Sequence, residues 1–365
     1  MKRFLTVIIT VGAFCMFIIC SGAAYAQDIS MGALPPELQD TIENLLSTRW
    51  PPVVDDVTLD PEEPAEDEEV TITVTTKVVS NESTDYTSEA VVVYSTDGGE
   101  TWDEIELEEG DDDTEWIGTF PGFESGTEVI YGIRAVDSSD NVYVELPCEP
   151  AEWPPADEYI EEDCVAEEDF SACGGNLPRY CMFPMSKDDE GDDEDSVVPA
   201  DLDFWESRVG QSEDKYYADL VVEGKIYEGT ISPMDIYLYA VLIINPDKGE
   251  AESIGEILDK GIVLAYVPNI DIAGGMLPPG ADKCMIIWKE GNDAAFDNDS
   301  ITCKKKKNHL FIDFDKEMAF DNPSEYLTWV MINGHATNID PFEGKPGNFT
   351  HFTNVSTISR SFTVE

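Results

Sequence analysis

Strict alternation of apolar and polar side chains is the feature that most constrains this fold. Between residues 69 and 79, Val70, Ile72 and Val74 fall on one side of an extended chain, and threonines fall on the other. Successive side chains of a β-strand point to opposite faces, so this period of two is typical of a strand with one buried face. Residues 128–136 repeat the pattern. The sequence therefore predicts an all-β fold.

Seven runs of this kind occupy the first part of the chain and predict a β-sandwich. They lie near 53–59, 69–79, 90–95, 101–107, 114–120, 128–136 and 141–146. Turn signals separate them, such as Asp-Gly-Gly at 97–99 and Pro-Gly at 121–122. Seven short strands in about a hundred residues are typical of an immunoglobulin-like sandwich. We predict this domain over residues 51–147.

This part of the chain also resembles the bacterial immunoglobulin-like or fibronectin type III-like domains of exported proteins. The resemblance rests on PPVVDDVTLDPEEP, EEVTITVTTKV, AVVVYSTDGGETW and GTFPGFESGTEVIYGIRAVDSSDN, about a quarter of the chain. It implies that Tyr131 is a buried strand tyrosine. It also implies a spacer, adhesion or binding module and no reaction.

Residues 1–26 are typical of a signal peptide. Two basic residues precede an apolar run over 4–20, and Ala-Tyr-Ala at 24–26 ends the segment with small residues where signal peptidase reads them. We expect cleavage before Gln27 and export to the periplasm, the cell surface or the medium. The alternatives are an uncleaved anchor and a lipoprotein attached through Cys20. No later stretch is long and apolar enough to predict a transmembrane segment.

Residues 27–50 are predicted to form a lead-in with a short helix. Leu38, Ile42 and Leu45 fall on one helical face, and Pro36 suits a first turn. We expect this helix to cap the next domain, and a segment for partner assembly is the alternative.

Residues 148–200 are expected to be an acidic linker tied by disulfides. Its charge blocks EYIEEDCVAEEDF and KDDEGDDEDS carry too little apolar surface to bury a core. Six cysteines follow the predicted signal peptide, and an even number in an exported chain indicates up to three disulfides. They are Cys148, Cys164, Cys173, Cys181, Cys284 and Cys303. The last two flank neighbouring predicted strands and are expected to pair with each other.

Residues 201–365 are predicted to form a second β-sandwich. Strand-like segments include DIYLYAVLIINP, GIVLAYVPN, NHLFIDFD, EYLTWVMING and the closing STISRSFTVE, and several are apolar at consecutive positions. The opening, ADLDFWESRVGQSEDKYYADLVVEG, resembles the first strands of family-nine carbohydrate-binding modules and of the related C-terminal domain of glucodextranases. That resemblance implies a structural calcium at Asp201 and Asp203.

The net charge of −56 limits the classes of partner. Nucleic acid and anionic lipid would be repelled, so neither is expected. Cations would be attracted, and a saline habitat or calcium loading would each relieve the self-repulsion.

Clusters of Asp and Asn are the calcium candidates, because calcium takes six to eight oxygen ligands. The candidates are Asp137, Asp140, Asn141, Asp201, Asp203, Asp297 and Asp299. A plain polar turn is the alternative for 137–141 and for 297–300. The acidic run 188–195 is interpreted as a solvated charge run.

Aromatic side chains are the candidates for saccharide binding, because they can stack on a sugar ring. Tyr237 and Tyr239 share one face of a predicted strand, and Trp205, Trp288 and Trp329 lie in others. Burial in the core is the alternative for each of them.

Residues 95–102 match the Asp-box pattern of sialidase propellers. Propellers repeat this box in each blade, and here it occurs once, so we predict a β-hairpin turn and reject a sialidase. Lys304 to Lys307 form the one basic cluster after the signal peptide. They predict a hairpin tip, serving either as a solvated turn that blunts a strand edge or as a dock for an acidic surface.

No pattern of catalytic residues stands out. The histidines, His309, His335 and His351, show no metal spacing, the sequence lacks a G-x-S-x-G elbow, and the many carboxylates identify no acid pair. We therefore predict an exported non-enzymatic binding protein whose partner is a glycan or a cell-surface protein, with calcium as a possible stabilising ion. The alternatives are a structural, adhesion or assembly component of the cell envelope and an unrecognised hydrolase.

Overall fold

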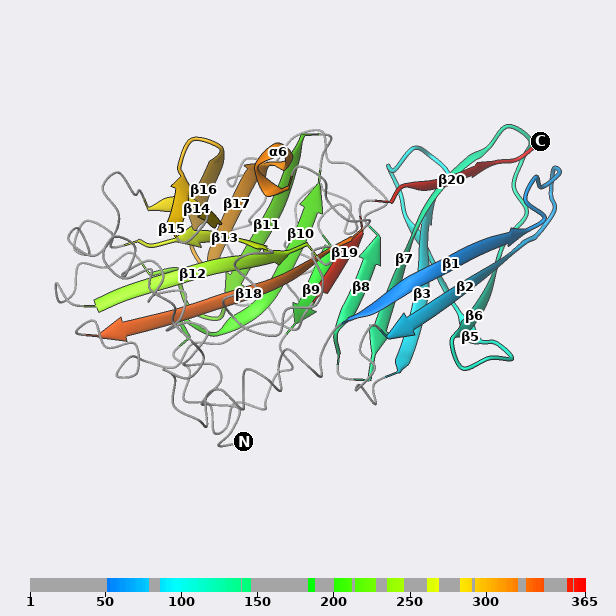
Figure 1. The fold of residues 1–365 in the computed structure, drawn as a ribbon. Helices are drawn as coiled ribbons and strands as arrows, with labels where there is room; N and C mark the ends of the chain where they lie inside the picture. The colour runs from blue at the N-terminus through cyan, green and yellow to red at the C-terminus, as the bar shows by residue number, and fades with distance from the viewer. Residues whose placement is uncertain are drawn as a thin grey trace.

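The computed structural model describes most of the chain after residue 50. The described ranges are 51–78, 86–138, 140–145, 183–187, 200–211, 214–227, 235–245, 261–268, 283–290, 293–320, 326–337, 353–356 and 358–365. The predicted signal peptide, the lead-in helix, nearly all of the acidic linker and four cysteines (Cys148, Cys164, Cys173, Cys181) lie outside them. Strands dominate, and the predicted all-β fold is confirmed (Figure 1).

The first half of the molecule is a β-sandwich. One sheet has the order β1 (Pro52–Asp60), β2 (Val70–Val78), β6 (Glu115–Phe120) and β5 (Glu108–Glu109). The facing strands are β8 (Val142–Glu145), β7 (Glu128–Asp137), β3 (Thr87–Ser95) and β4 (Asp103–Glu106). Val70, Ile72 and Val74 are fully buried between the sheets, as their alternation predicts, and Tyr131 is buried with them.

The second half also consists of two facing sheets. One has the order β16 (Ile301–Lys306), β17 (His309–Asp315), β11 (Lys215–Val222), β10 (Phe204–Gln211) and β9 (Phe183–Lys187). The other runs through β15 (Asp293–Asp297), β14 (Cys284–Glu290), β13 (Gly261–Tyr266), β12 (Asp235–Ile244), β18 (Tyr326–Thr337) and β19 (Thr353–Ser356). A short helix, α6 (Lys316–Ala319), follows β17. Trp329, Leu220 and Phe314 are among the fully buried core residues.

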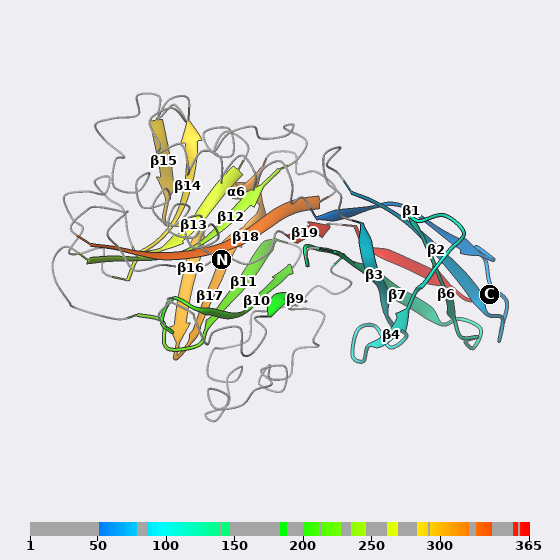
Figure 2. The same cartoon turned by 90° about the horizontal axis from the view of Figure 1, so that it is seen from below.

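One sheet runs through both halves. β19 pairs in parallel with β8, with Val355 opposite Val144, so the order continues β12-β18-β19-β8-β7-β3. Figure 2 shows the strands of the two halves meeting at β19. The two halves are therefore joined by backbone hydrogen bonds as well as by the chain.

The closing strand β20 (Arg360–Thr363) lies with the first half. It pairs antiparallel with β7, and Phe362 stands opposite Val129. The closing segment was predicted to be strand-like and to belong to the second sandwich, and nothing in the sequence indicated this partner, more than two hundred residues away. Within the described residues, no helix is long and apolar enough to cross a membrane.

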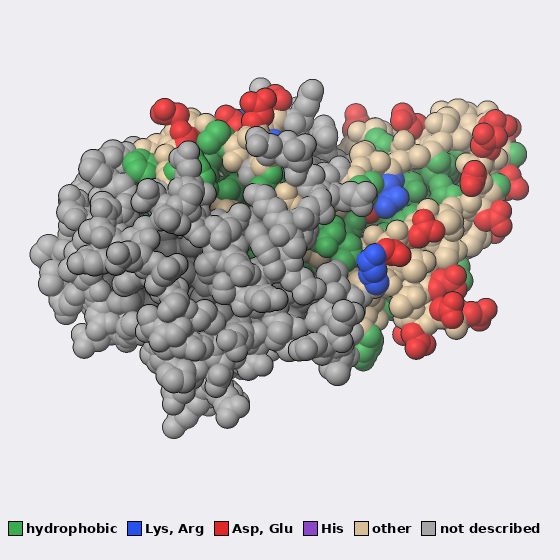
Figure 3. Space-filling model, in the orientation of Figure 1, with side chains coloured by type: hydrophobic (Ala, Val, Ile, Leu, Met, Phe, Trp, Pro, Cys, Tyr) green, Lys and Arg blue, Asp and Glu red, His purple; other side chains and the backbone are tan. Residues whose placement is uncertain are grey.

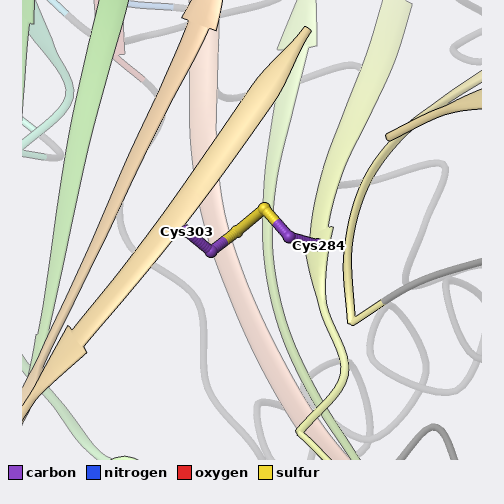
Figure 4. The surroundings of a disulfide bond; sticks show 2 residues. All are labelled: Cys284 and Cys303. Atoms are coloured by element: carbon purple, nitrogen blue, oxygen red, sulfur yellow. A yellow bond between two sulfur atoms is a disulfide. The ribbon is translucent and has the colours of Figure 1, made fainter. Parts of the chain in front are cut away.

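A disulfide between Cys284 and Cys303 ties the two sheets of the second half together (Figure 4). Cys284 begins β14 and Cys303 lies in β16, and their Cα atoms are 5.8 Å apart. The predicted pairing of these two cysteines is confirmed. The bond joins strands that belong to two facing sheets. The order of strands along the sequence does not reveal whether two of them are neighbours in one sheet or lie in facing sheets.

Removing this disulfide is expected to destabilise the protein. Cross-linking residues 19 positions apart restricts the unfolded chain, and closing a loop of roughly this size stabilises by about 3 kcal/mol in the chain-entropy account. Urea unfolding of a Cys284→Ser/Cys303→Ser variant measures the loss. Reducing the native protein should produce at least the same loss, because it breaks this disulfide together with any among the other cysteines. An unchanged midpoint after both treatments would contradict the prediction.

Candidate functional site

A group of hydrogen-bonded, largely buried polar side chains lies where the closing strand meets the first half. We call Tyr143, Glu145, Ser356 and Arg360 the junction cluster. Arg360 donates from Nε to Oε2 of Glu145 at 2.8 Å and from Nη2 to Oε1 at 3.0 Å. The Tyr143 hydroxyl donates to Oε1 of the same carboxylate at 3.1 Å. Strands β8 and β20, which lie more than two hundred residues apart in the chain, are thereby held at one carboxylate.

Burial dominates the electrostatics of this cluster. The Glu145 side chain is 0% exposed, and its desolvation raises its pKa, while the Arg360 guanidinium, Tyr143 and the backbone N–H of Ile133 offset only part of the rise. Burial alone would lower the pKa of Arg360, but the bonds and the charge of Glu145 outweigh burial and raise that pKa. The cluster is therefore suited to fixing structure, because its polar atoms are directed at one another.

The sequence offered only a faint signal of this cluster. Glu145 lies in the strand predicted near 141–146, and Arg360 is one of 21 basic residues in a chain that has 77 acidic ones. Because acidic residues greatly outnumber basic ones, many carboxylates are candidate partners for any one arginine, and the sequence does not say which of them it pairs with. Only the tertiary structure selects Glu145.

A second group of buried charges lies on the sheet that contains β10, β11 and β17. Both carboxylate oxygens of Asp219 lie near Nδ1 of His309, at 3.0 and 3.1 Å. Arg208 donates to Glu206 at 2.8 and 3.0 Å, and Arg208 stands opposite Asp219 across the strand pair. A histidine held at Nδ1 by a carboxylate has the orientation of a general base.

Burial argues against catalysis by this second group. His309 and Asp219 are 1% and 0% exposed, so both side chains are enclosed by the core and offer almost no surface to a substrate. Among the described residues, no three His, Cys, Asp or Glu side chains are grouped so that they could hold a metal ion. A buried ion pair is weak evidence of net stabilisation, because desolvating the two charges offsets their attraction.

The tyrosines predicted for saccharide binding lie in the core. Tyr237 is 2% exposed and stacks on Tyr227, with ring centroids 3.8 Å apart. Tyr239 is fully buried, donates its hydroxyl to the carbonyl of Asp201 at 2.7 Å and accepts from the backbone N–H of Tyr227. Neither ring presents a face to a sugar. Three tryptophans complete the set: Trp329 is fully buried, and Trp205 and Trp288 are half-buried.

The calcium candidate at 137–141 is a turn whose carboxylate is hydrogen-bonded within the turn itself. Asp137 is 1% exposed, and its carboxylate accepts from both the backbone N–H and the side-chain amide of Asn141 at 2.9 Å. Asp140 has φ of 64°, a left-handed conformation that Asp tolerates in turns. These hydrogen bonds are those expected of the polar-turn alternative, and calcium binding at this turn stays a prediction.

The other calcium candidates are also engaged in local structure. The Asp297 carboxylate accepts from the backbone N–H of Ser300 at 2.8 Å, while Asp299 is exposed. Asp203 is buried, and its carbonyl accepts from the backbone of Glu223, whereas Asp201 is half-buried. Among the described residues these carboxylates belong to no group of three His, Cys, Asp or Glu side chains that could hold a metal ion, and calcium binding at these positions stays a prediction.

Residues 95–102 form the predicted hairpin turn between β3 and β4. The Asp97 carboxylate accepts from the backbone N–H and the hydroxyl of Thr101, at 2.9 and 2.6 Å, and from the Ser95 hydroxyl at 2.7 Å. Gly98 and Gly99 have φ of 74° and 94°, which side chains disfavour. The bonds of Thr101 come first among the causes that lower the pKa of Asp97 to about 2.

This carboxylate should titrate well below an ordinary aspartate. Because its folded pKa is depressed, the stability that it contributes is present above the unfolded pKa and is lost as the pH falls through about 2. A carboxylate NMR titration measures the midpoint, and Thr101→Val should raise it toward 3.8. Thr119→Val, on β6 of the other sheet, is the matched control. Equal midpoints in both variants would contradict the assignment to Thr101.

The lysine cluster lies on the predicted hairpin. Lys304 to Lys306 end β16, the edge strand of its sheet, and Lys307 enters the turn with φ of 53°. Lysines on an edge strand hinder pairing with another chain. This location fits the edge-blunting alternative, and docking onto an acidic surface stays a prediction.

Comparison with known proteins gives no family. No protein-family model and no curated protein matches the chain. A DUF4785 family protein from Legionella pneumophila is similar at 8% identity over 82% of this chain and 56% of that one, with a TM-score of 0.17. A cycloalternan-degrading enzyme from Trueperella pyogenes is similar at 9% identity over 84% of this chain and 34% of that one, with a TM-score of 0.19. The chain thus spans less than two thirds of either protein, and such scores carry no argument about function.

Proposed function

We propose that this protein is an exported, non-enzymatic structural component of the cell envelope, in which joined sandwiches act as a rigid spacer or assembly module. The observation that carries the proposal is the sheet shared by both halves, in which β19 pairs with β8 and β20 returns to β7. In a module of this kind, backbone hydrogen bonds between β19 and β8 would hold the two halves in a fixed relative position, which a flexible linker alone would not do. Export rests on the signal peptide predicted at residues 1–26.

The proposal includes an immunoglobulin-like identity for the first half. Its support is the pair of facing sheets over residues 52–145 and the buried Tyr131, which the family resemblance implies. Domains of this kind serve as spacers and adhesion modules. Acidic side chains are scattered over the visible face of this half in Figure 3, and with the net charge of −56 they would keep such a module soluble and would repel nucleic acid.

A structural function is favoured over saccharide binding by the placement of the aromatic residues. Tyr237, Tyr239 and Trp329 are buried in the core, so a surface for stacking on a sugar ring would have to come from other residues. The carboxylates predicted for calcium accept hydrogen bonds within their own turns, as Asp137 and Asp297 do.

A glycan array probed with the full chain, with and without a calcium chelator, tests the proposal. A structural module should give no saccharide signal in either condition. A reproducible signal would replace the structural function by saccharide binding, and loss of that signal on chelation would restore calcium as its partner. Heat-denatured protein on the same array serves as the control for adhesion of the acidic chain.

A further inference from the structure

The closing strand β20 is bound by the first half as if it were a separate peptide. Its backbone pairs with residues 128–131 of β7. Beyond the strand, Val364 donates to the carbonyl of Thr127 at 3.0 Å and accepts from the N–H of Gly126 at 2.9 Å. Glu365 donates to the carbonyl of Pro64 at 2.9 Å. All of these partners belong to the first half.

Side chains at alternate positions of this segment point into the sandwich. The Phe362 ring lies 5.3 Å from the ring of Phe120 and 6.2 Å from that of Tyr131, and it is 8% exposed. Val364 is 3% exposed and belongs to the same core cluster. The third inward side chain is Arg360, which reaches the buried Glu145.

This arrangement has the components of strand addition to a sheet edge. In that mode of recognition, main-chain hydrogen bonds give affinity, and pockets for alternate side chains give specificity. Here the pockets take an arginine, a phenylalanine and a valine in that order. The residues that alternate with these three in the strand are Ser361 and Thr363, whose side chains point outward and are exposed.

The connection into this segment favours exchange between molecules. β19 ends at Ser356 and β20 begins at Arg360, so only a short stretch joins the strand in the shared sheet to the strand on β7. Short hinges favour domain swapping, and a swapped strand makes the same contacts in a second copy as in its own. When β20 is exchanged between two copies, it therefore keeps every contact that it makes within one copy.

We infer that β7, with the aromatic core and the buried Glu145 behind it, forms a strand-acceptor site for extended segments of the pattern Arg-x-Phe-x-Val, and that its occupant in assembly is β20 of a second copy. The inference rests on the proposed structural function and deepens it, because it names the partner. The partner is another copy of this chain, joined through β7 of one copy and β20 of the other.

Cysteine trapping between full-length copies tests this inference. Ser361 and Ile130 are paired across β20 and β7. One copy, labelled with nitrogen-15, carries Ser361→Cys, and an unlabelled copy carries Ile130→Cys. After mixing at high concentration and mild oxidation, mass spectrometry should detect a disulfide that links a labelled peptide to an unlabelled one. Mixing the first copy with one that carries Glu109→Cys, exposed on β5 of the other sheet, measures random collision.

The expected result is several-fold more cross-copy disulfide for the 361–130 pair than for the 361–109 pair. A single chain with both Ser361→Cys and Ile130→Cys checks the register within one molecule. Closure within that chain together with no excess between copies would overturn the inference and leave the structural function standing. Failure of the single chain to close would overturn it as well. A saccharide signal on the array together with cross-copy disulfides would instead remove only the proposed function.

Discussion

Replacing Phe362 with alanine is expected to lower the free energy of unfolding of the first sandwich by about 3–5 kcal/mol, the usual range for a large aromatic side chain lost from a core. Its ring contacts Phe120, Phe123 and Tyr131, all of which lie more than two hundred residues earlier in the chain. Removing the ring opens a cavity among these aromatic side chains and also weakens the docking of β20. Urea unfolding, followed by tyrosine and tryptophan fluorescence, measures the loss.

Ser361→Ala is the matched control for this prediction. It changes the neighbouring residue on the same strand, but its side chain is exposed on the outer face. Surface substitutions of this kind usually stay within about 0.5 kcal/mol. Similar losses for both variants would mean that β20 contributes through its backbone alone and that the Phe362 pocket is unimportant.

Replacing Arg360 with methionine is expected to cost about 3–5 kcal/mol at neutral pH, because it leaves a buried carboxylate without its charged partner. Glu145 is fully buried, and Arg360 makes two hydrogen bonds to it. Methionine keeps most of the length of the side chain, so the loss reports on charge more than on packing. Chemical unfolding of the full chain measures it.

A second substitution separates the charge from the packing. Glu145→Gln combined with Arg360→Met removes both charges, and replacing a buried pair in this way is often neutral. The double variant should therefore recover most of the stability that Arg360→Met alone loses. A double variant that is no more stable than the single one would contradict the interpretation of the pair as a buried ion pair.

The same pair predicts a pH dependence. The folded pKa of Glu145 is already raised by burial, and removing Arg360 takes away the group that opposes the rise. A raised folded pKa means that the stability associated with the protonated carboxyl is present below the unfolded pKa and is lost as the pH rises through the folded pKa. The deficit of Arg360→Met should therefore shrink on acidification toward the ordinary glutamate pKa of 4.5. A deficit that stays constant with pH would contradict this sign.

Much of the local structure could be predicted from the sequence because it depends on neighbours along the chain. Alternation in residues 69–79 predicts β2 and its buried face, and Val70, Ile72 and Val74 are indeed fully buried. The Asp-Gly-Gly stretch at 97–99 predicts a hairpin turn, and Asp97 closes it with bonds to Ser95 and Thr101.

The candidate site could not be predicted in the same way. Tyr237 and Tyr239 look equally suited to stacking on a sugar and to filling a core, since both uses need the same apolar ring. Their burial is decided by the facing sheet of β10, β11 and β17, which comes from other parts of the chain. Glu145 and Arg360, which form the best-defined polar cluster, have nothing local to connect them.

The sequence by itself indicated many of the strands and, for residues 69–79, the buried face, because side-chain alternation and turn chemistry act within a few residues. It did not indicate β9, which lies in the segment expected to be an acidic linker. Only the tertiary structure decided that β19 continues the sheet into β8 and that β20 returns to β7. Backbone hydrogen bonds are the same for any strand and do not select a partner. Selection comes from the fit of Phe362 into its aromatic pocket and from the ion pair of Arg360 with Glu145, which form between residues far apart in the chain.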